Sequence, residues 1–230
     1  MSAPLIPLVR GRGVARTYGS GPAATVALTP TDCEVWPESR IALVGQSGSG
    51  KSTLLHLMAG LDEPTVGEVG WPGIGERGAL RPGPVAVVFQ GPSLLPPLSV
   101  AENVGLPLTL AGHPAAEVTR RVQGALERLG LTELADKLPE EISGGQSQRV
   151  AVARALAGEP RLILADEPTG QLDHEIGAVV IDELVAVADR CGAGLVVATH
   201  DDAVAARLSQ SWRMRNGDLL TDSKEPSFSL

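Results

Sequence analysis

The chain has 230 residues, a length that suits one domain, or one domain with a subdomain. Apolar residues make up 43% and charged residues 20%, an ordinary globular composition that excludes wholesale disorder. The net charge of −8 argues against a nucleic-acid partner, because binding to a phosphate backbone usually needs a basic surface. No apolar run approaches the roughly 18 residues of a membrane span, and the N-terminus lacks the pattern of a secretion signal.

The two cysteines, Cys33 and Cys191, lie far apart in the sequence. They lack the close spacing of metal-ligand motifs, so a metal site built on them is not expected. We predict two reduced, partly buried thiols, as is usual for a protein of the cytoplasm.

Short β-rich runs alternate along the chain with stretches of helical period, which predicts an α/β protein with a largely parallel sheet. The central strands are expected over residues 41–44, 85–89, 162–165 and 195–199. Each is almost continuously apolar, as in a sheet that is covered on both faces. Helices are expected over residues 51–59 and after His174, where apolar residues recur on one face.

A helical region is inserted between the second and third of these strands. Apolar residues recur at helical spacing over residues 118–129, and a second helix is expected over residues 145–157. Further on, the pair Asn216-Gly217 between two β-rich runs predicts a hairpin with a tight primed turn. Residues 221–230 are expected to form a frayed tail.

A glycine-rich loop follows the first predicted strand and precedes a predicted helix, the context that a phosphate-binding loop needs. Its glycines let consecutive backbone N–H groups curl around phosphate oxygens at the helix N-terminus. Lys51 would reach the β- and γ-phosphates, and Ser52 would bind Mg²⁺. The residues predicted to bind nucleotide here are Gly45, Gln46, Ser47, Gly48, Ser49, Gly50, Lys51, Ser52 and Thr53.

Two carboxylates, Asp166 and Glu167, come directly after the buried strand 162–165, at the edge of an α/β sheet where ligands bind. Asp166 is placed to hold Mg²⁺, and Glu167 is placed to orient and deprotonate the attacking water. An acidic pair in this position could instead cap the next helix.

A second candidate anion site precedes the helix predicted over residues 145–157. It offers backbone N–H groups at a helix N-terminus without a lysine, from Ser143, Gly144, Gly145 and Gln146. A chain with two such sites could clamp one nucleotide between two copies of itself. The alternative is an ordinary helix cap.

In their order, these motifs resemble the nucleotide-binding domain of ABC transporters over nearly the whole chain. The resemblance implies a phosphate-loop NTPase core of the RecA-like kind, with a mixed, largely parallel sheet, a helical subdomain that carries the signature motif, and a small antiparallel β region. It divides the chain into a core of residues 1–90 and 161–220, a helical subdomain of residues 91–160 and a tail of residues 221–230.

The same resemblance assigns residue roles. Gln90 becomes the Q-loop glutamine, a catalytic residue and Mg²⁺ ligand, and His200 becomes the catalytic switch histidine at the γ-phosphate. The residues from Ser143 to Gln146 match the signature, and Asp173 matches the D-loop aspartate. Tyr18 matches the aromatic residue that stacks on adenine, with a packed strand aromatic as the alternative. For His200 the alternative is a satisfied histidine after a strand.

Three further segments, residues 60–67, 94–96 and 164–173, are similar to the subfamily of macrolide-export, lipoprotein-release, peptide-antibiotic-resistance and cell-division ATPases. Members of that subfamily pair with permeases of few membrane spans, and their work is often mechanical. The chain departs from the pattern at Ile142, Ser147 and Gln171, and residues 71–84 are shorter than usual. None of these departures removes a catalytic group.

The resemblance implies an ATP-hydrolysing subunit that uses ATP and Mg²⁺, forms a homodimer and serves a separate integral membrane permease from the cytoplasmic face of the membrane. We expect the permease to dock between Gln90 and Glu102, unless Leu94, Leu95 and Leu98 merely form the core of the helical subdomain. One rival is a soluble ABC ATPase acting on nucleic acid or ribosomes, for whose usual additions 230 residues leave no room. The other is a non-hydrolysing regulatory subunit, against which Glu167 and His200 argue.

Overall fold

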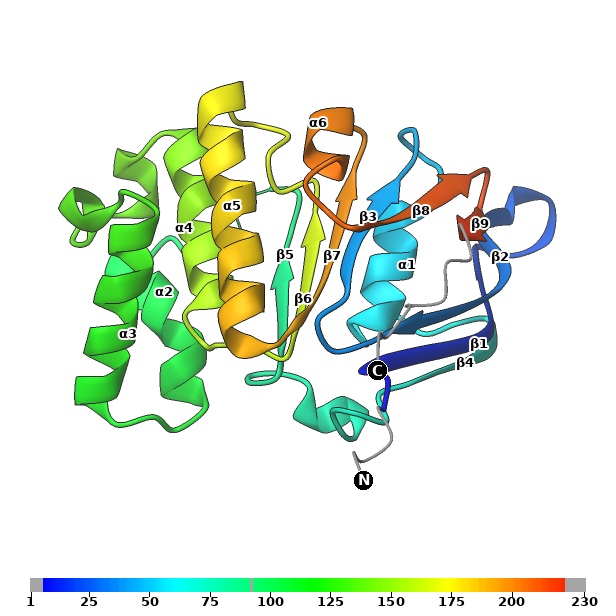
Figure 1. Cartoon of the computed structure of the whole chain (residues 1–230), viewed down its shortest axis with the longest axis horizontal. Coiled ribbons are helices and arrows are strands. Elements are labelled where there is room, and N and C mark those ends of the chain that lie inside the picture. Colours follow the sequence, from blue (N-terminus) through cyan, green and yellow to red (C-terminus); the bar gives the residue numbers. More distant parts are fainter. Residues whose placement is uncertain (1–5, 92, 222–230) are drawn as a thin grey trace.

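The computed structural model describes residues 6–91 and 93–221, and it has the predicted α/β architecture (Figure 1). Its main sheet is six-stranded, in the order β5-β6-β7-β3-β8-β9. The pairings are parallel except for β8 with β9, so the sheet is mixed but largely parallel. The strands are β3 Arg40–Val44, β5 Val85–Val88, β6 Leu162–Asp166, β7 Gly194–Thr199, β8 Gln210–Arg215 and β9 Asp218–Thr221.

All four predicted central strands are confirmed, with ends that differ by at most one residue. Their continuous apolar sequence reflects two hydrophobic cores, one on each face of the sheet. In β3, Ile41 and Leu43 belong to the core that contains α1 (Lys51–Met58), whereas Ala42 belongs to the core shared with the other long helices. Because successive side chains of a strand point to opposite faces, both cores draw on every central strand.

A second, three-stranded antiparallel sheet lies beside the main sheet, at the side opposite α3 in Figure 1. Its order is β2-β1-β4, and its strands are β1 Val9–Tyr18, β2 Thr25–Val35 and β4 Val66–Gly70. The β1–β2 register shifts between Gly11 and Val14 and twice more before Tyr18. Bulges of this kind interrupt strict alternation, which explains why the sequence pattern did not mark these strands.

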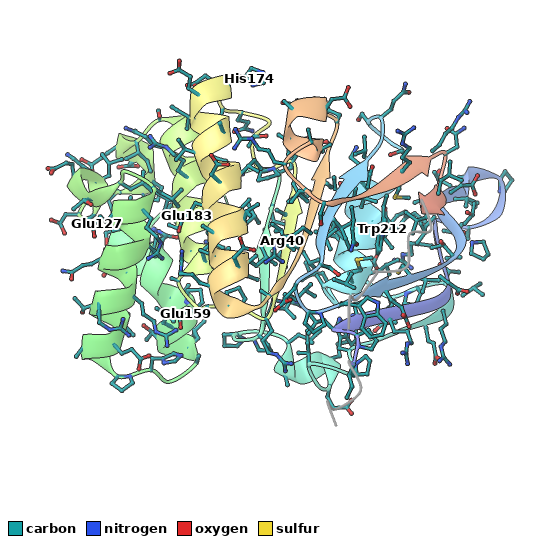
Figure 2. The ribbon with its side chains drawn as sticks, in the orientation of Figure 1. Arg40, Glu127, Glu159, His174, Glu183 and Trp212 are labelled. Atoms are coloured by element: carbon teal, nitrogen blue, oxygen red, sulfur yellow. The ribbon has the colours of Figure 1, made fainter. Side chains whose placement is uncertain are left out.

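The helices α2, α3 and α4 lie together at one side of the molecule (Figure 1). The predicted helices correspond to α1, α3, α4 and α5, whereas α2 was not predicted and contains Gly105 and Pro107, which weaken a helical pattern. An ion pair of 2.5 Å joins Arg128 of α3 to Glu183 of α5; Figure 2 labels Glu183. The remaining helices are α2 Val100–Leu110, α3 Ala115–Arg128, α4 Gly144–Leu156, α5 His174–Cys191, α6 Asp202–Ala205 and the short 3-10 helices Gly21–Ala23, Arg77–Ala79, Thr132–Leu134 and Pro139–Glu141.

The predicted hairpin near the C-terminus is confirmed. Asn216 and Gly217, between β8 and β9, have φ angles of 52° and 86°, the positive values that a type I′ turn needs. Thr221 ends β9, and the rest of the predicted tail lies outside the described residues. The domain boundaries at residues 91 and 161 stay a prediction.

The cysteines are free, with Cys33 buried and Cys191 half-buried, as predicted. Burial raises the pKa of the Cys33 thiol to about 12, so this sulfur is a packing group rather than a nucleophile. None of the helices in the described ranges combines the length and the hydrophobicity that a bilayer crossing requires.

Candidate active site

The candidate site lies where four neighbouring parallel strands end at the same edge of the sheet. The phosphate loop follows β3, His200 follows β7, Glu167 follows β6, and Gln90 lies two residues beyond β5. These segments surround a cavity of about 630 Å³, lined by Ala27, Gln46, Ser47, Gly48, Ser49, Gly50, Lys51, Ser52, Thr53, Gln90, Glu167 and His200. Parallel strands thus bring together predicted residues that are far apart in the sequence.

Two glycines of the loop are required by close backbone contacts. A Cβ atom on Gly45 would lie 2.5 Å from the carbonyl oxygen of Met214, and one on Gly50 would collide with the carbonyl oxygen of Ala27. Gly50 also has a φ of 104°, which side-chain-bearing residues rarely adopt. The closest of these contacts come from the carbonyl oxygens of Ala27 and Met214, and a backbone contact gives no signal in the residue type.

Lys51 is buried at the start of α1, and its ammonium group is held by the loop that precedes it. Its Nζ atom donates hydrogen bonds to the carbonyl oxygens of Gly45, at 2.7 Å, and Gln46, at 3.2 Å. It also lies 3.5 Å from Oε1 of Glu167. The Ser49 hydroxyl is buried and has no hydrogen-bond partner among the described residues. A lysine, a free hydroxyl and a helix N-terminus at one cavity fit a bound phosphate.

Glu167 holds a backbone conformation that is unusual for its residue type. Its φ is 46°, in the left-handed region that glycine favours. Two backbone hydrogen bonds hold it there, from its N–H to the Ala198 oxygen at 3.0 Å and from the Gly170 N–H to its own oxygen at 3.1 Å. Its Oε2 atom lies 2.8 Å from Nδ1 of His200. Backbone strain of this kind is concentrated at functional sites.

The residues predicted to bind Mg²⁺ come from three elements. Asp166 ends β6 with a buried carboxyl group, and its Oδ1 atom has no hydrogen-bond partner among the described residues. Ser52 and Gln90 line the cavity. In the described part of the chain, no group of three or more His, Cys, Asp or Glu residues is arranged so that it could hold a metal ion. Mg²⁺ at nucleotide sites, however, needs only one or two carboxylates beside the phosphates. The residues therefore fit Mg²⁺, which when bound neutralises phosphate charge.

The signature residues do not line this cavity. Ser143 caps α4 in a capping box, in which its Oγ atom accepts from the Gln146 N–H at 3.2 Å and Oε1 of Gln146 accepts from the Ser143 N–H at 2.8 Å. Asp173 caps α5 by accepting from the Ile176 N–H at 2.9 Å, next to His174 at the helix end labelled in Figure 2. Within one chain, the two candidate phosphate sites are therefore separate.

Tyr18 ends β1 outside the cavity lining, and pairs with Thr25 two residues before Ala27. The Arg16 guanidinium lies over the Tyr18 ring, 4.6 Å from the centroid, and the Tyr18 hydroxyl donates a hydrogen bond to Asp62 at 2.8 Å. Burial opposes ionisation of Asp62, but hydrogen bonds from Tyr18 and the Glu63 N–H, together with Arg16, hold the pKa of this carboxyl group below its usual value. These contacts fix the ring at the end of β1, where it is exposed, and its stacking on adenine stays a prediction.

The fold and the cavity together define a phosphate-loop nucleotide hydrolase. A family model described as "ABC transporter" matches residues 28–170. The lipoprotein-releasing system ATP-binding protein LolD of Shewanella sp. (strain MR-4) is 39% identical over 219 residues, which cover 92% of this chain and 95% of that protein.

Two solved structures are similar over most of their length. The dimeric post-hydrolysis structure of the ATP-binding cassette MJ0796, bound to ADP and Pi, has a TM-score of 0.84 and 33% identity, over 93% of this chain and 98% of that one. The protein cbiO1 from Clostridium perfringens, part of the ABC transporter complex cbiONQ, has a TM-score of 0.79 and 29% identity, over 93% of this chain and 87% of that one.

This chain belongs to the ABC transporter family. It is an ATPase, with ATP as its nucleotide and Mg²⁺ as the accompanying ion. The resemblance drawn from the motifs alone is therefore confirmed for the fold, the family and the activity.

Proposed function

We propose that the chain is the ATP-hydrolysing subunit of a transport complex, that two copies close on ATP, and that this closure does mechanical work on a separate membrane permease. The observation that carries the proposal is the separation of the two phosphate sites. Lys51 and Glu167 line the cavity, whereas Ser143 caps a helix outside it. A second copy, arranged head to tail, would bring its own Ser143 to the phosphates in the first.

Within each composite site, the contacts support distinct roles. Glu167 would take a proton from the attacking water, and His200, 2.8 Å away, would hold its carboxylate in place. Lys51 and the loop N–H groups would bind the phosphates and stabilise charge that develops on them. Asp166, Ser52 and Gln90 would hold Mg²⁺. Asp173, at the start of α5, would contact the second copy.

The relatives support a transport role for such a dimer. LolD is named as the ATP-binding protein of a releasing system, and cbiO1 as part of a transporter complex. MJ0796 was solved as a dimer. By analogy we place this chain at the cytoplasmic face of a membrane, attached peripherally to its permease.

A groove of about 470 Å³ next to the Gln90 segment supports a docking place for the permease. It lies between β5, α2 and α4, and its wall includes Phe89, Leu106 and Leu110. Leu110 is 67% exposed, and Leu95, in the segment predicted to dock, is 43% exposed. Leu94 instead packs against the helical core, so the docking proposal rests on Leu95 and not on Leu94. An apolar helix of the permease fits this surface.

A mixing experiment tests the composite site. Neither Lys51→Ala nor Ser143→Arg chains should hydrolyse ATP alone, because every site of either homodimer lacks one half. A mixed dimer combines the intact cavity of one chain with the intact signature of the other. Equal mixing should therefore restore activity to at most about a quarter of the wild-type rate, since half of the dimers are mixed and each has one sound site.

The same experiment has clear contrary outcomes. Full activity after mixing would contradict the composite site, which allows a mixed dimer at most one sound site. A chain that stays monomeric with ATP and still hydrolyses it at the wild-type rate would contradict it too. Size-exclusion chromatography with ATP and Mg²⁺ reports the oligomeric state alongside the rate.

A further inference from the structure

Gln148 is a buried polar residue on α4, five residues after the helix cap Ser143. Only 1% of its surface is exposed. It stands in an i, i+4 row with Val152 and Leu156, both buried apolar residues, so a helix built only for packing would place an apolar side chain here. That break in the row is the sequence signal by which Gln148 could have been found.

The side-chain amide of Gln148 bridges two segments of the candidate site. Its Nε2 atom donates to the carbonyl oxygen of Phe89 at 3.2 Å and to that of Pro168 at 3.3 Å. Phe89 immediately precedes Gln90, and Pro168 immediately follows Glu167. One amide group therefore joins α4 to both the Gln90 and the Glu167 segments.

A second contact from α4 brackets Gln90 on its other side. Nη1 of Arg154 donates to the Ser93 carbonyl oxygen and Nη2 to the Ser93 hydroxyl, each at 2.7 Å. Phe89 and Ser93 are thus both fastened to one helix, with Gln90 between them. A displacement of α4 must therefore displace the Gln90 segment as well.

The remaining amide atom, Oε1 of Gln148, is buried and has no hydrogen-bond partner among the described residues. The amide cannot be turned over to satisfy it, because Oε1 would then face two carbonyl oxygens. A buried acceptor without a partner costs free energy, so packing stability alone does not explain a glutamine at this position.

We infer that Gln148 is a positioning residue, through which the place of α4 sets the geometry of Gln90 and Glu167 and hence the rate of hydrolysis. This inference rests on the proposed function and deepens it. The hydrogen bond from Gln148 to Pro168 lies next to the strained backbone of Glu167, whose φ of 46° depends on surrounding contacts. When a second copy or a permease shifts α4, the same amide carries the shift to both catalytic segments.

The test is Gln148→Met, which keeps the length of the side chain but removes both donors and the unpaired acceptor. We expect kcat to fall roughly tenfold, because misplacing a catalytic group slightly is costly. The Kd for ATP should change less than about twofold, since Lys51 and its loop are untouched. The matched control is Gln123→Met on α3, where the side chain is exposed, and it should leave kcat and Kd unchanged.

An unchanged kcat in a folded Gln148→Met chain, or an equal loss of ATP affinity, would overturn the inference. If the wild-type chain itself hydrolysed no ATP, the proposed function would fail instead, so the two failures are distinguishable. Thermal unfolding establishes that each variant is folded.

A measurement on the wild-type chain keeps the inference testable even if Gln148→Met does not fold. In the ¹⁵N-labelled protein, the side-chain NH₂ signals of Gln148 should shift when a non-hydrolysable ATP analogue and Mg²⁺ are added. Those of Gln123 should not. Unmoved Gln148 signals, in a sample whose phosphate-loop signals do shift, would contradict a coupling role.

Discussion

The carboxylate of Glu167 has two close neighbours, the Lys51 ammonium group at 3.5 Å and the His200 imidazole at 2.8 Å. Glu167→Gln keeps the shape of the side chain but removes the group that can accept a proton from water. We expect ATP turnover to fall roughly 10²-fold or more, with ATP still bound. A phosphate-release assay and a nucleotide-binding titration on the same preparation measure the two quantities.

Asp182→Asn is a matched control for Glu167→Gln, since it also replaces a carboxylate by its amide. Asp182 lies on α5 and pairs with Arg207, away from the cavity lining. It should hydrolyse ATP at the wild-type rate. Near-normal turnover in Glu167→Gln would remove Glu167 from the role of general base and leave its strained backbone without an explanation.

The helices α2 and α4 both begin with a serine in a capping box. A comparison of the two serines therefore separates the effect of helix capping from that of anion binding. Ser99 caps α2 and Ser143 caps α4, each in a capping box completed three residues later. Ser99→Ala and Ser143→Ala should each lower the free energy of unfolding by about 1 kcal/mol, because each removes one cap. Only Ser143→Ala should also reduce ATPase activity and ATP-dependent dimerisation.

Chemical denaturation of both variants, with ATPase rates measured on the same samples, decides between the two interpretations of the signature serine. If the two variants lost similar stability and both kept full activity, Ser143 would be an ordinary helix cap. The comparison is direct because the two capping hydrogen bonds have the same length. The Glu102 N–H donates to the Ser99 hydroxyl at 3.2 Å, and the Gln146 N–H donates to the Ser143 hydroxyl at 3.2 Å.

At the scale of elements, the sequence predicted the strands, helices and loops whose pattern lies within one short, contiguous stretch of residues. The central strands are apolar on both faces, and the phosphate loop and the acidic pair are contiguous, so their place and context could be predicted. The strands β1, β2 and β4 were missed because bulges break their alternation, and α2 because glycine and proline interrupt it. Backbone contributions such as that of Ala27 to the loop depend on tertiary contacts that residue type does not encode.

At the scale of the whole molecule, the groove beside β5 and the nucleotide cavity are lined by adjacent residues, Phe89 in the groove and Gln90 in the cavity. Its wall contains Phe89, next to Gln90, and the basic residues Arg81, His113 and Arg154, with no acidic residue among the described ones that line it. Burial lowers the pKa of Arg154, whose guanidinium is held by the Ser93 carbonyl oxygen and hydroxyl but has no carboxylate partner among the described residues. A permease helix that docks here should therefore combine apolar residues with a carboxylate.

The docking proposal is tested by Leu110→Glu in the groove and by Leu95→Glu in the segment predicted to dock, which both place a charge on an exposed apolar side chain. Each should abolish co-purification of the membrane partner from detergent-solubilised membranes, because an unpaired carboxylate would be buried at the interface. ATP hydrolysis by the isolated chain should survive, since neither residue lines the nucleotide cavity.

The control is Leu220→Glu, which changes a side chain that is 55% exposed on β9, at the opposite edge of the sheet. This variant should co-purify with the membrane partner at wild-type yield. If both the Leu95→Glu and the Leu110→Glu variants retained the membrane partner at wild-type yield, the permease would dock elsewhere, and the link from α4 through Gln90 to the membrane would have to be sought on another face.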